Sequence, residues 1–389
     1  MRNNQKDKSM NKIIKRGLFS IIISLLFMTG GCQCTGPKPA LQLPSELATQ
    51  LDHLIESEML SKNLPGVVVG VWIPDRGNYL KTFGKANLAT NTKRQIDDPF
   101  RIASITKTFT ATVVLSLVDD DLLSTSDSLS KYLPDFPNAE NITIRNLLRM
   151  RSGIVDYANA SILSEWYNDV YKNYPLDTLI ESMASNGNEF TVAGQQTVYC
   201  NGNYTILAKV AEIASGRNFA YLVNEKVLLP LNLKSSSYPE PDNHTLGGNN
   251  RGYSWENAAS RFADKTEMNT SCGNAAGAII SNMNDLAKYA RALYKGTLLS
   301  EETQQKRLET EIFKGAPPFL QYGEGILKQG EFYGHNGTIF GFSTEMFYLP
   351  AEDAVIVINV NRLDMDDKSW SGELFAEISR LLFPKHVSW

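Results

Sequence analysis

The chain has 389 residues, of which 42% are apolar, so it can bury a core as one large domain or two closely joined ones. This composition excludes a disordered or fibrous protein. The first 31 residues hold six basic side chains and one acidic side chain, whereas the remainder holds 32 basic and 41 acidic ones, a net charge of −9. A protein with this acidic net charge lacks the basic surface that binds nucleic acids, so no nucleic-acid partner is expected.

Residues 1–31 have the pattern of an export signal. Basic residues ending at Arg16 precede the apolar run 18–28, which is too short for the roughly 20 residues that span a bilayer. Such a run is typical of the apolar region of a signal peptide, and Met10 gives a more ordinary signal length than Met1 does. The chain is therefore expected to be exported.

Cys32 directly follows two glycines in a pattern that resembles a bacterial lipoprotein cleavage site. Lipidation of Cys32 is the leading expectation; ordinary cleavage with soluble export and an uncleaved anchor are the alternatives. Residues 32–44 contain three prolines and a glycine, which suits a tether. The folded body is expected at 45–389, held in the cell envelope by the lipid on the periplasmic or outer-membrane face, and otherwise secreted.

One helix and a hairpin are predicted at the start of the folded body. Apolar residues recur at helical spacing through residues 45–63, with Ser45 as the N-cap. Residues 66–73 and 79–83 are β-branched and aromatic runs separated by the turn residues 74–78, a pattern that predicts a β-hairpin.

Ser104 and Lys107 lie three positions apart at the head of the apolar stretch 109–117. On a helix these side chains share one face, so Lys107 can reach the hydroxyl of Ser104. A serine is a weak nucleophile unless a neighbour takes its proton, and partial burial lowers the pKa of a lysine enough for this task. A second copy of the spacing, Ser128 to Lys131, lies among Ser, Asp and Thr residues and predicts a solvated helix end or turn.

A mostly helical segment is predicted from residue 122 to about 216, with its clearest pieces at 144–150, 176–184 and 204–214. Strand patterns return only after Tyr322. These runs form a predicted meander at 323–328, 332–334, 343–349 and 354–360, closed by a helix at 371–382. The sheet is therefore expected to come from both chain ends, with a helical subdomain at about 122–275 between them.

Residues 234–273 form a long polar segment rich in Ser, Asn and Gly. Loops of this length in compact proteins are often functional lids, and a disordered insertion is the alternative.

Tyr199 and Asn201 stand just before a predicted helix. A tyrosine can relay a proton once nearby cations lower its pKa, and an asparagine can bind a substrate amide. The same Tyr-x-Asn form recurs at 171–173, so spacing alone does not select this pair.

His335, Gly337 and Thr338 lie between two predicted strand segments. Gly337 has no side chain to keep a substrate from the backbone. His335 could offer a substrate carboxylate a positive or hydrogen-bonding group, while the backbone N–H groups of Thr338 and Ser104 form an oxyanion hole.

Two cysteines, Cys200 and Cys272, remain in the folded body. An exported protein could join them as a disulfide, although two free, partly buried thiols are favoured. The chain holds four histidines and no Cys/His cluster at metal-ligand spacing, so no metal and no cofactor are expected.

The order Ser-x-x-Lys, Tyr-x-Asn, His-x-Gly resembles the penicillin-recognising serine hydrolases: class C β-lactamases, D-alanyl-D-alanine carboxypeptidases and related esterases. The resemblance covers roughly residues 51–382. Residues 100–103 lead into the serine as in that family, and 143–148 followed by Ser152 and Gly153 are also similar.

The resemblance implies an α/β (α+β) fold with a five-stranded antiparallel sheet flanked by helices, an inserted all-helical subdomain and a cleft between them. It also implies acyl transfer through a covalent ester on Ser104. Lys107 and Tyr199 would share the proton transfers, Asn201 would orient the substrate, and His335 would meet its carboxylate. Which of Lys107 and Tyr199 is the base in acylation stays open, because the pair would titrate as a unit.

One difference from the family pattern indicates which branch of the family this chain resembles most. Class C β-lactamases carry lysine where His335 lies, so the carboxypeptidase and esterase branches fit better. We therefore expect an exported serine hydrolase for a small peptide, ester or β-lactam substrate, cell-wall peptides included. A D-amino-acid peptidase or D-alanyl-D-alanine carboxypeptidase leads, ahead of an esterase and a β-lactamase. A penicillin-binding or sensor protein without turnover is the alternative of another class.

Overall fold

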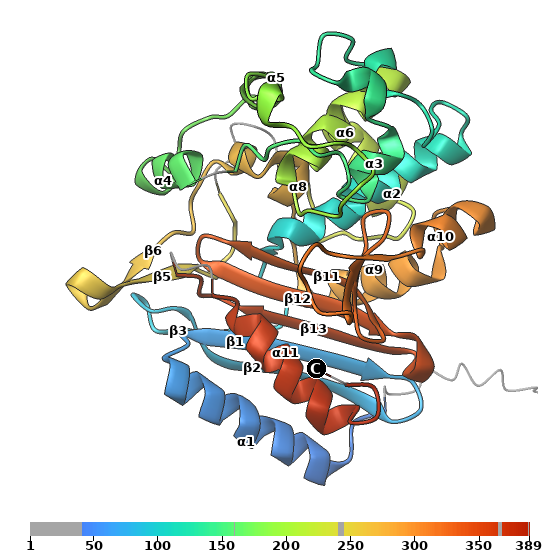
Figure 1. The fold of residues 1–389 in the computed structure, drawn as a ribbon. Coiled ribbons are helices and arrows are strands. Elements are labelled where there is room, and N and C mark those ends of the chain that lie inside the picture. The colour runs from blue at the N-terminus through green and yellow to red at the C-terminus, as the bar shows by residue number, and fades with distance from the viewer. Residues whose placement is uncertain (1–40, 159, 240–244, 365–367, 388) are drawn as a thin grey trace, which may run out of the picture. The chain divides into compact units, whose positions relative to one another are not determined.

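The computed structural model describes most of the chain from residue 41 to the end (Figure 1). The stretches outside the described residues are 1–40, 159, 240–244, 365–367 and 388. The predicted signal peptide, Cys32 as the predicted site of lipidation, and residues 32–40 of the predicted tether fall in the first of these stretches. Within the described part, no helix combines the length and apolarity needed to cross a membrane.

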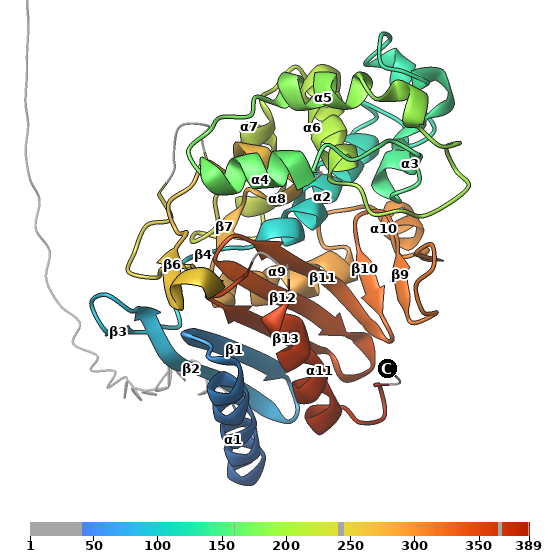
Figure 2. The ribbon, with the colours of Figure 1, turned by 60° about the vertical axis from the view of Figure 1, so that its left-hand side comes forward.

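A nine-stranded antiparallel sheet forms the centre of the fold, in the order β3-β2-β1-β13-β12-β11-β10-β9-β8. Its strands are β1 (Gly66–Ile73), β2 (Gly77–Asn87), β3 (Thr92–Lys93), β8 (Glu311–Ile312), β9 (Leu320–Tyr322), β10 (Leu327–Gln329), β11 (Phe332–Ile339), β12 (Phe342–Leu349) and β13 (Ala354–Val360). Strands from the two chain ends lie side by side where β1 pairs with β13 (Figures 1 and 2). This confirms the predicted origin of the sheet, but the strand count of five is wrong.

Short strands explain the difference in count. β3, β8, β9 and β10 have two or three residues each, too few to produce a recognisable alternation in the sequence. Two further pairs lie outside the main sheet: β4 (Phe100–Arg101) with β7 (Ile280–Ser281), and β5 (Tyr253–Glu256) with β6 (Arg261–Asp264). The prediction of strands only after Tyr322 is therefore wrong, as is a fully disordered segment at 234–273.

Helices cover both faces of the sheet. α1 (Ser45–Lys62) and α11 (Trp370–Leu382) pack on one face, and α9 (Met283–Lys295) packs on the other (Figure 1). Every residue of β12 and β13 is consequently buried, as expected of central strands covered on both sides. Ser45 is the first residue of α1 and Pro44 holds the N-cap position, so the predicted cap is wrong by one residue.

The helical part lies on one side of this sheet (Figure 1). Its helices are α2 (Thr106–Asp119), α3 (Ile144–Leu148), α4 (Ala160–Asn168), α5 (Leu176–Ala184), α6 (Asn201–Ser215), α7 (Phe219–Val223) and α8 (Asn274–Gly277), and α10 (Glu301–Arg307) follows α9. α2 packs against α6 and α8, and 11 of its 14 residues are buried. The subdomain boundary at about 122–275 stays a prediction, although β5 and β6 make part of that segment non-helical.

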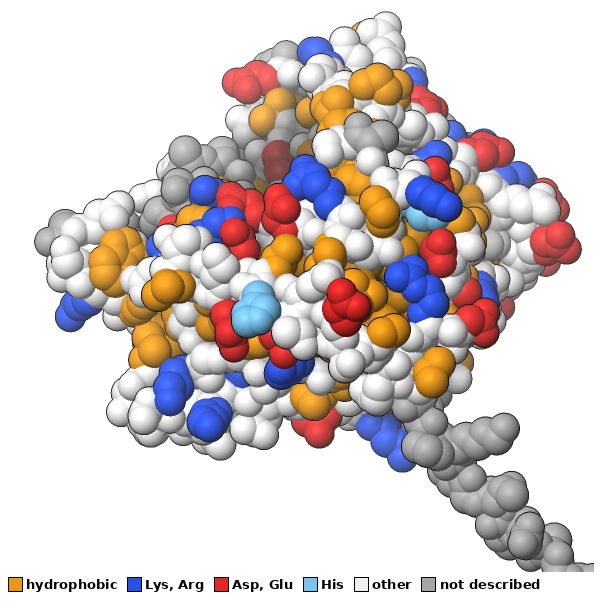
Figure 3. All heavy atoms as spheres, turned by 90° about the horizontal axis from the view of Figure 1, so that it is seen from below, with side chains coloured by type: hydrophobic (Ala, Val, Ile, Leu, Met, Phe, Trp, Pro, Cys, Tyr) orange, Lys and Arg blue, Asp and Glu red, His pale blue; other side chains and the backbone are white. Residues whose placement is uncertain are grey.

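The face seen from below Figure 1, where α1 lies, carries acidic and basic side chains interspersed (Figure 3). Lys62 of α1 contacts Glu58 on the same helix and Glu373 of α11, and Lys81 of β2 pairs with Asp52 of α1. The positive charges of these two lysines are therefore balanced locally.

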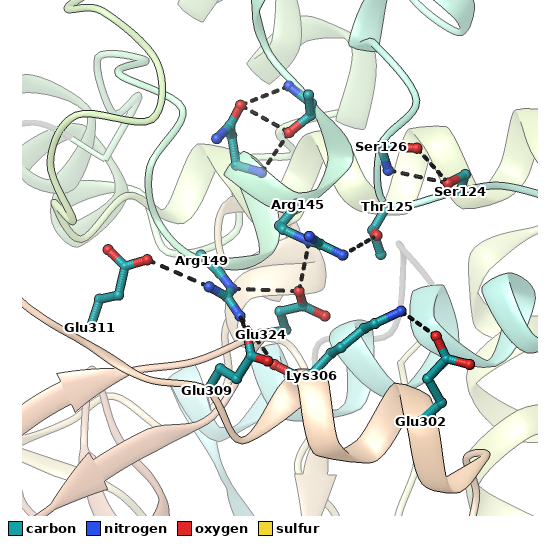
Figure 4. Close-up of polar contacts among 12 residues, drawn as sticks. Ser124, Thr125, Ser126, Arg145, Arg149, Glu302, Lys306, Glu309, Glu311 and Glu324 are labelled. Atoms are coloured by element: carbon teal, nitrogen blue, oxygen red, sulfur yellow. Dashed lines mark hydrogen bonds and ion pairs between the residues drawn. The ribbon is translucent and has the colours of Figure 1, made fainter.

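A cluster of charged side chains joins α3 to the edge of the sheet (Figure 4). The Nε atoms of Arg145 and Arg149 lie 3.2 and 3.4 Å from Oε1 of Glu324, in the turn between β9 and β10. Glu324 is 1% exposed, and this burial raises the pKa of its carboxyl group while the arginines oppose the rise. Arg149 also reaches Glu309 at 2.8 Å and Glu311 at 3.5 Å, which fastens the helical part to the short strands.

Candidate active site

Ser104 lies where the chain turns from β4 into α2. It belongs to a short 3₁₀ turn, Ala103–Ile105, directly before the first residue of α2. Ala103 has a φ of +48°, a backbone conformation that residues with a side chain seldom adopt. This sharp turn leaves Ser104 partly exposed on the wall of a cavity.

Lys107 is fully buried in the first turn of α2. Its Nζ donates to Oγ of Ser104 at 2.8 Å, to Oδ1 of Asn201 at 2.8 Å and to the carbonyl of Ala276 at 2.9 Å. Burial lowers the pKa of Lys107 to about 7, although the negative charge of Asp156 opposes this shift. A substantial fraction of Lys107 is therefore neutral near pH 7 and able to accept a proton from Ser104.

Asp156 is a residue of this site that the sequence analysis missed. Its Oδ2 accepts hydrogen bonds from both the backbone N–H and the Nδ2 of Asn201, each at 2.9 Å, and its Oδ1 accepts one from the N–H of Gly202 at 3.1 Å. Asp156 thus caps the first turn of α6 and turns the amide oxygen of Asn201 towards Lys107. A single carboxylate in an irregular loop, 45 positions from its partner, leaves no spacing pattern to detect.

Tyr199 lies between Lys107 and His335. Its ring centre lies 4.8 Å from Nζ of Lys107 and 6.2 Å from the ring centre of His335. The side chain is 40% exposed, whereas Lys107 is enclosed, so a bound molecule can reach Tyr199 directly. The structure therefore brings together Ser104, Lys107, Tyr199 and Asn201, which the sequence separates by nearly a hundred residues.

His335 lies within β11, not between two strands as predicted. The ring is 1% exposed, with Nε2 3.3 Å from the hydroxyl of Tyr322 and Nδ1 2.5 Å from the carbonyl oxygen of Asn336. Burial, together with the charge of Lys107, lowers the pKa of His335 to about 3. His335 is therefore neutral near pH 7, which favours the hydrogen-bonding role over the positive one; its role towards a substrate carboxylate stays a prediction.

The absence of a side chain at Gly337 lets another segment of the protein backbone pack closely against β11. A Cβ atom at this position would lie 2.3 Å from the carbonyl oxygen of Ile102 and 2.9 Å from the backbone nitrogen of Ser104. β11 therefore packs directly against the segment that carries Ser104. The next residue, Thr338, lines the same cavity as Ser104.

Two cavities flank Tyr199, which lines both of them. The first, of about 540 Å³, is also lined by Ser104, Asn201 and Thr338. The second, of about 580 Å³, is lined by residues that include His335 and Lys314. Both fall within the size range of small-molecule sites.

The remaining candidates lie apart from this chemistry. Ser128 caps the 3₁₀ turn Leu129–Lys131, and Lys131 pairs with Asp127 at 2.8 Å, which confirms the predicted solvated turn. Cys200 and Cys272 are free and buried, as favoured. Across the described residues, no group of three or more His, Cys, Asp or Glu side chains is placed to hold a metal ion.

Two curated proteins are similar to this chain at low sequence identity. Penicillin-binding protein 4* of Bacillus subtilis is 23% identical over 308 residues, which cover 74% of this chain and 66% of that protein. Protein flp of Staphylococcus aureus is 23% identical over 330 residues, which cover 82% of this chain and 64% of that protein. The chain thus spans just under two thirds of the length of these relatives.

Solved structures share the fold. A D-stereospecific amidohydrolase from Streptomyces sp. is 25% identical with a TM-score of 0.76, covering 88% of this chain and 99% of that chain. A D-amino acid amidase from Ochrobactrum anthropi SV3, complexed with D-phenylalanine, is 21% identical with a TM-score of 0.77, covering 88% and 100%. The family model for beta-lactamase matches residues 51–374, and so the chain belongs to the beta-lactamase family.

Proposed function

We propose that the protein is an exported serine hydrolase that forms an acyl-enzyme on Ser104, acting as a D-amino-acid peptidase or a D-alanyl-D-alanine carboxypeptidase-like enzyme. One observation carries this proposal: a fully buried lysine, with its pKa lowered to about 7, lies 2.8 Å from the hydroxyl of Ser104. A serine held in this way has the base that nucleophilic catalysis requires.

The proposed reaction has two steps. In acylation, Lys107 or Tyr199 takes the proton of Ser104 while Oγ attacks the substrate carbonyl, and the same coupled pair returns a proton to the leaving group as its bond to the carbonyl breaks. In deacylation, water attacks the ester, and Ser104 regains its proton as the acid product leaves. Asn201 holds the substrate, and the 2.8 Å contact of its Oδ1 with Lys107 links it to the base.

Strand geometry supports the proposed oxyanion hole. Phe340 and Gly341 form a two-residue turn between β11 and β12. Ile339 and Phe342, which flank this turn, are therefore a hydrogen-bonded pair of the two strands. The next pair, Thr338 with Ser343, is then a non-hydrogen-bonded pair, and the N–H of Thr338 points away from β12. It can therefore join the N–H of Ser104 in binding the oxyanion.

The names of the structural neighbours favour amide substrates that contain D-amino acids, because a D-amino acid amidase and a D-stereospecific amidohydrolase share the fold. An esterase of neutral substrates is the second candidate. The neutral, enclosed ring of His335 favours it, because that ring brings no positive charge to a substrate carboxylate. The β-lactamase alternative and the penicillin binder without turnover remain outcomes of the test.

Export and anchoring rest on the N-terminal sequence. Residues 1–31 have the signal-peptide pattern, and Cys32 would carry the lipid that holds the protein in the cell envelope, with cell-wall peptides within reach.

The test follows three substrates in parallel: a D-alanyl-D-alanine peptide, a nitrophenyl ester and a fluorescent penicillin, each with wild type and Ser104→Ala. Steady product release that requires Ser104 supports an enzyme, and the better substrate decides between peptidase and esterase. Stable labelling by penicillin without turnover would instead indicate a binder. Turnover that survives Ser104→Ala would refute the assignment.

A further inference from the structure

We propose that the acyl part of the substrate carries a large, uncharged apolar side chain, which occupies the 540 Å³ cavity beside Ser104. This inference rests on the proposed function and, within it, favours a peptidase for bulky D-amino acids over a D-alanyl-D-alanine carboxypeptidase, whose acyl residue has only a methyl side chain. The cavity is hereafter called the acyl pocket.

The lining of the acyl pocket is mostly apolar. Its larger apolar and aromatic members are Tyr157, Leu163, Trp166, Tyr199, Ile339, Phe340 and Leu363. Among the described residues of this lining, none carries a charge. A charged substrate group entering here would lose its hydration without gaining a partner, whereas an apolar group gains free energy in proportion to the area that it buries.

The aromatic wall of the acyl pocket is held in place from two parts of the chain. Trp166 of α4 donates from Nε1 to the carbonyl of Asn269 at 3.1 Å, and its ring centre lies 4.9 Å from that of Phe340 in the β11–β12 turn. α4 lies in the helical part and the hairpin in the sheet (Figure 2). Tyr167 packs edge-on against Phe340 at 5.3 Å, so this wall is formed before any ligand binds.

The position of Tyr199 decides which end of the substrate enters the acyl pocket. Ser104 and Thr338, whose N–H groups would bind the oxyanion, line this pocket and not the second cavity. Tyr199 lines both cavities and, coupled with Lys107, would return a proton to the leaving group. The leaving group therefore departs towards the second cavity, where Lys314 lies, and the acyl side chain stays beside Ser104.

The test is a charge substitution on the pocket wall. Leu163 is 38% exposed on α4, so Leu163→Lys places a cation at the pocket without disturbing the core. Two substrate series are compared by kcat/KM: D-phenylalanine, D-alanine and D-glutamate amides, and nitrophenyl esters of phenylacetic, acetic and succinic acid. We expect the aromatic substrate to exceed the small one by about tenfold or more in wild type, with the acidic substrate poorest.

Leu163→Lys should raise the ratio of acidic to aromatic kcat/KM by about tenfold or more, because the ammonium group now pairs with the substrate carboxylate. Leu229→Lys is the matched control, since Leu229 is 67% exposed and lines neither cavity. Trp166→Ala should reduce the aromatic preference while the small substrate is still turned over.

Two results would overturn the inference: a wild-type preference for acidic or small acyl groups, or equal ratios in the Leu163→Lys and Leu229→Lys variants. Should Trp166→Ala fail to fold, the surface variant still decides. Failure of the proposed function is distinguishable, because turnover would then persist in Ser104→Ala, or wild type would turn over none of the six substrates.

Discussion

The carboxylate of Asp156 binds Asn201 twice, through the backbone N–H and through the side-chain Nδ2, both at 2.9 Å. These bonds leave the amide oxygen of Asn201 facing Lys107. The same carboxylate raises the pKa of Lys107 against the larger, opposite effect of burial. Asp156 is therefore a positioning residue that acts on both the geometry and the charge of the proposed base.

Asp156→Asn should lower kcat, by up to about 10²-fold, because the amide of Asn201 is no longer held in place. The acid limb of the kcat/KM profile should also move to lower pH, since loss of the negative charge lowers the pKa of Lys107 further. Asp119→Asn is the control: Asp119 accepts from the N–H of Ser300 at 2.7 Å and supports α10 outside the site. If Asp156 had a purely structural role, Asp156→Asn would destabilise the fold but would not shift the pH profile of kcat/KM.

Ser104→Ala and Lys107→Ala should each lower turnover by about 10³-fold or more, because residues that act as one catalytic unit fail together. In wild type, kcat/KM should rise with pH to a plateau above about 7, as Lys107 loses its proton. Ser128→Ala and Lys131→Ala are matched controls, because they share the spacing but lie in a solvated turn. Activity within about tenfold of wild type in either site variant would contradict the mechanism.

Gly337→Ala should abolish most of the activity, because the new Cβ would lie 2.3 Å from the carbonyl oxygen of Ile102 and push the segment carrying Ser104 out of place. Gly277→Ala provides the comparison: it also lies beside Ala103, but its Cβ would come no closer than 3.8 Å. Steady-state rates and thermal melting of the two variants separate a local displacement from general unfolding. Equal activity in both would mean that the close approach of β11 is not required.

Glu345→Gln should make the fold less sensitive to alkaline pH. Glu345 of β12 is buried beside the hydroxyls of Ser369 and Ser371, and burial raises its pKa to about 8 from 4.5. A raised pKa gives stability that is complete below the unfolded value and is lost as pH rises through the folded value. The melting temperature of Glu345→Gln, relative to wild type, should therefore climb between pH 5 and 8; a constant difference would contradict this account.

Cys32→Ala should abolish incorporation of a palmitate analogue in growing cells, because the thiol would be the acceptor of the lipid. Cys34→Ala, two positions along the chain, is the control and should keep the label. Label that survives in Cys32→Ala, or that is missing from wild type, would exclude the lipoprotein assignment and leave secretion or an uncleaved anchor.

Patterns that are local in the sequence predicted most of the fold. The β-branched run at 66–73 matches β1, and the helix predicted at 176–184 matches α5, because apolar periodicity reports burial within one element. Ser104 and Lys107 were predicted for the same reason, as their contact depends on one turn of backbone. The short strands at the sheet edge were not predicted, because they are defined by pairing with a neighbouring strand and not by a pattern in their own residues.

Features that depend on distant packing could not be predicted in this way. The neutral state of His335 follows from the enclosure of its ring beside Tyr322 and Lys107, which no triplet motif encodes. Gly337 was predicted to let a substrate lie against the backbone, and this stays a prediction; the close approach that the structure shows is that of the backbone of Ile102 and Ser104. Asp156 reaches its partner Asn201 across the fold, so its importance is visible only in three dimensions.

The placement of Ser104 and Lys107 at the head of one buried helix has an evolutionary consequence. In the proposed mechanism, proton transfer depends on a rigid element, whereas aromatic and apolar walls of the acyl pocket belong to α4 and the β11–β12 turn. Substitutions at Leu163 or Phe340 can then alter which molecules are accepted without altering the distance between nucleophile and base. Such separation lets a lineage acquire new substrates by changing pocket residues one at a time while the chemistry is inherited intact.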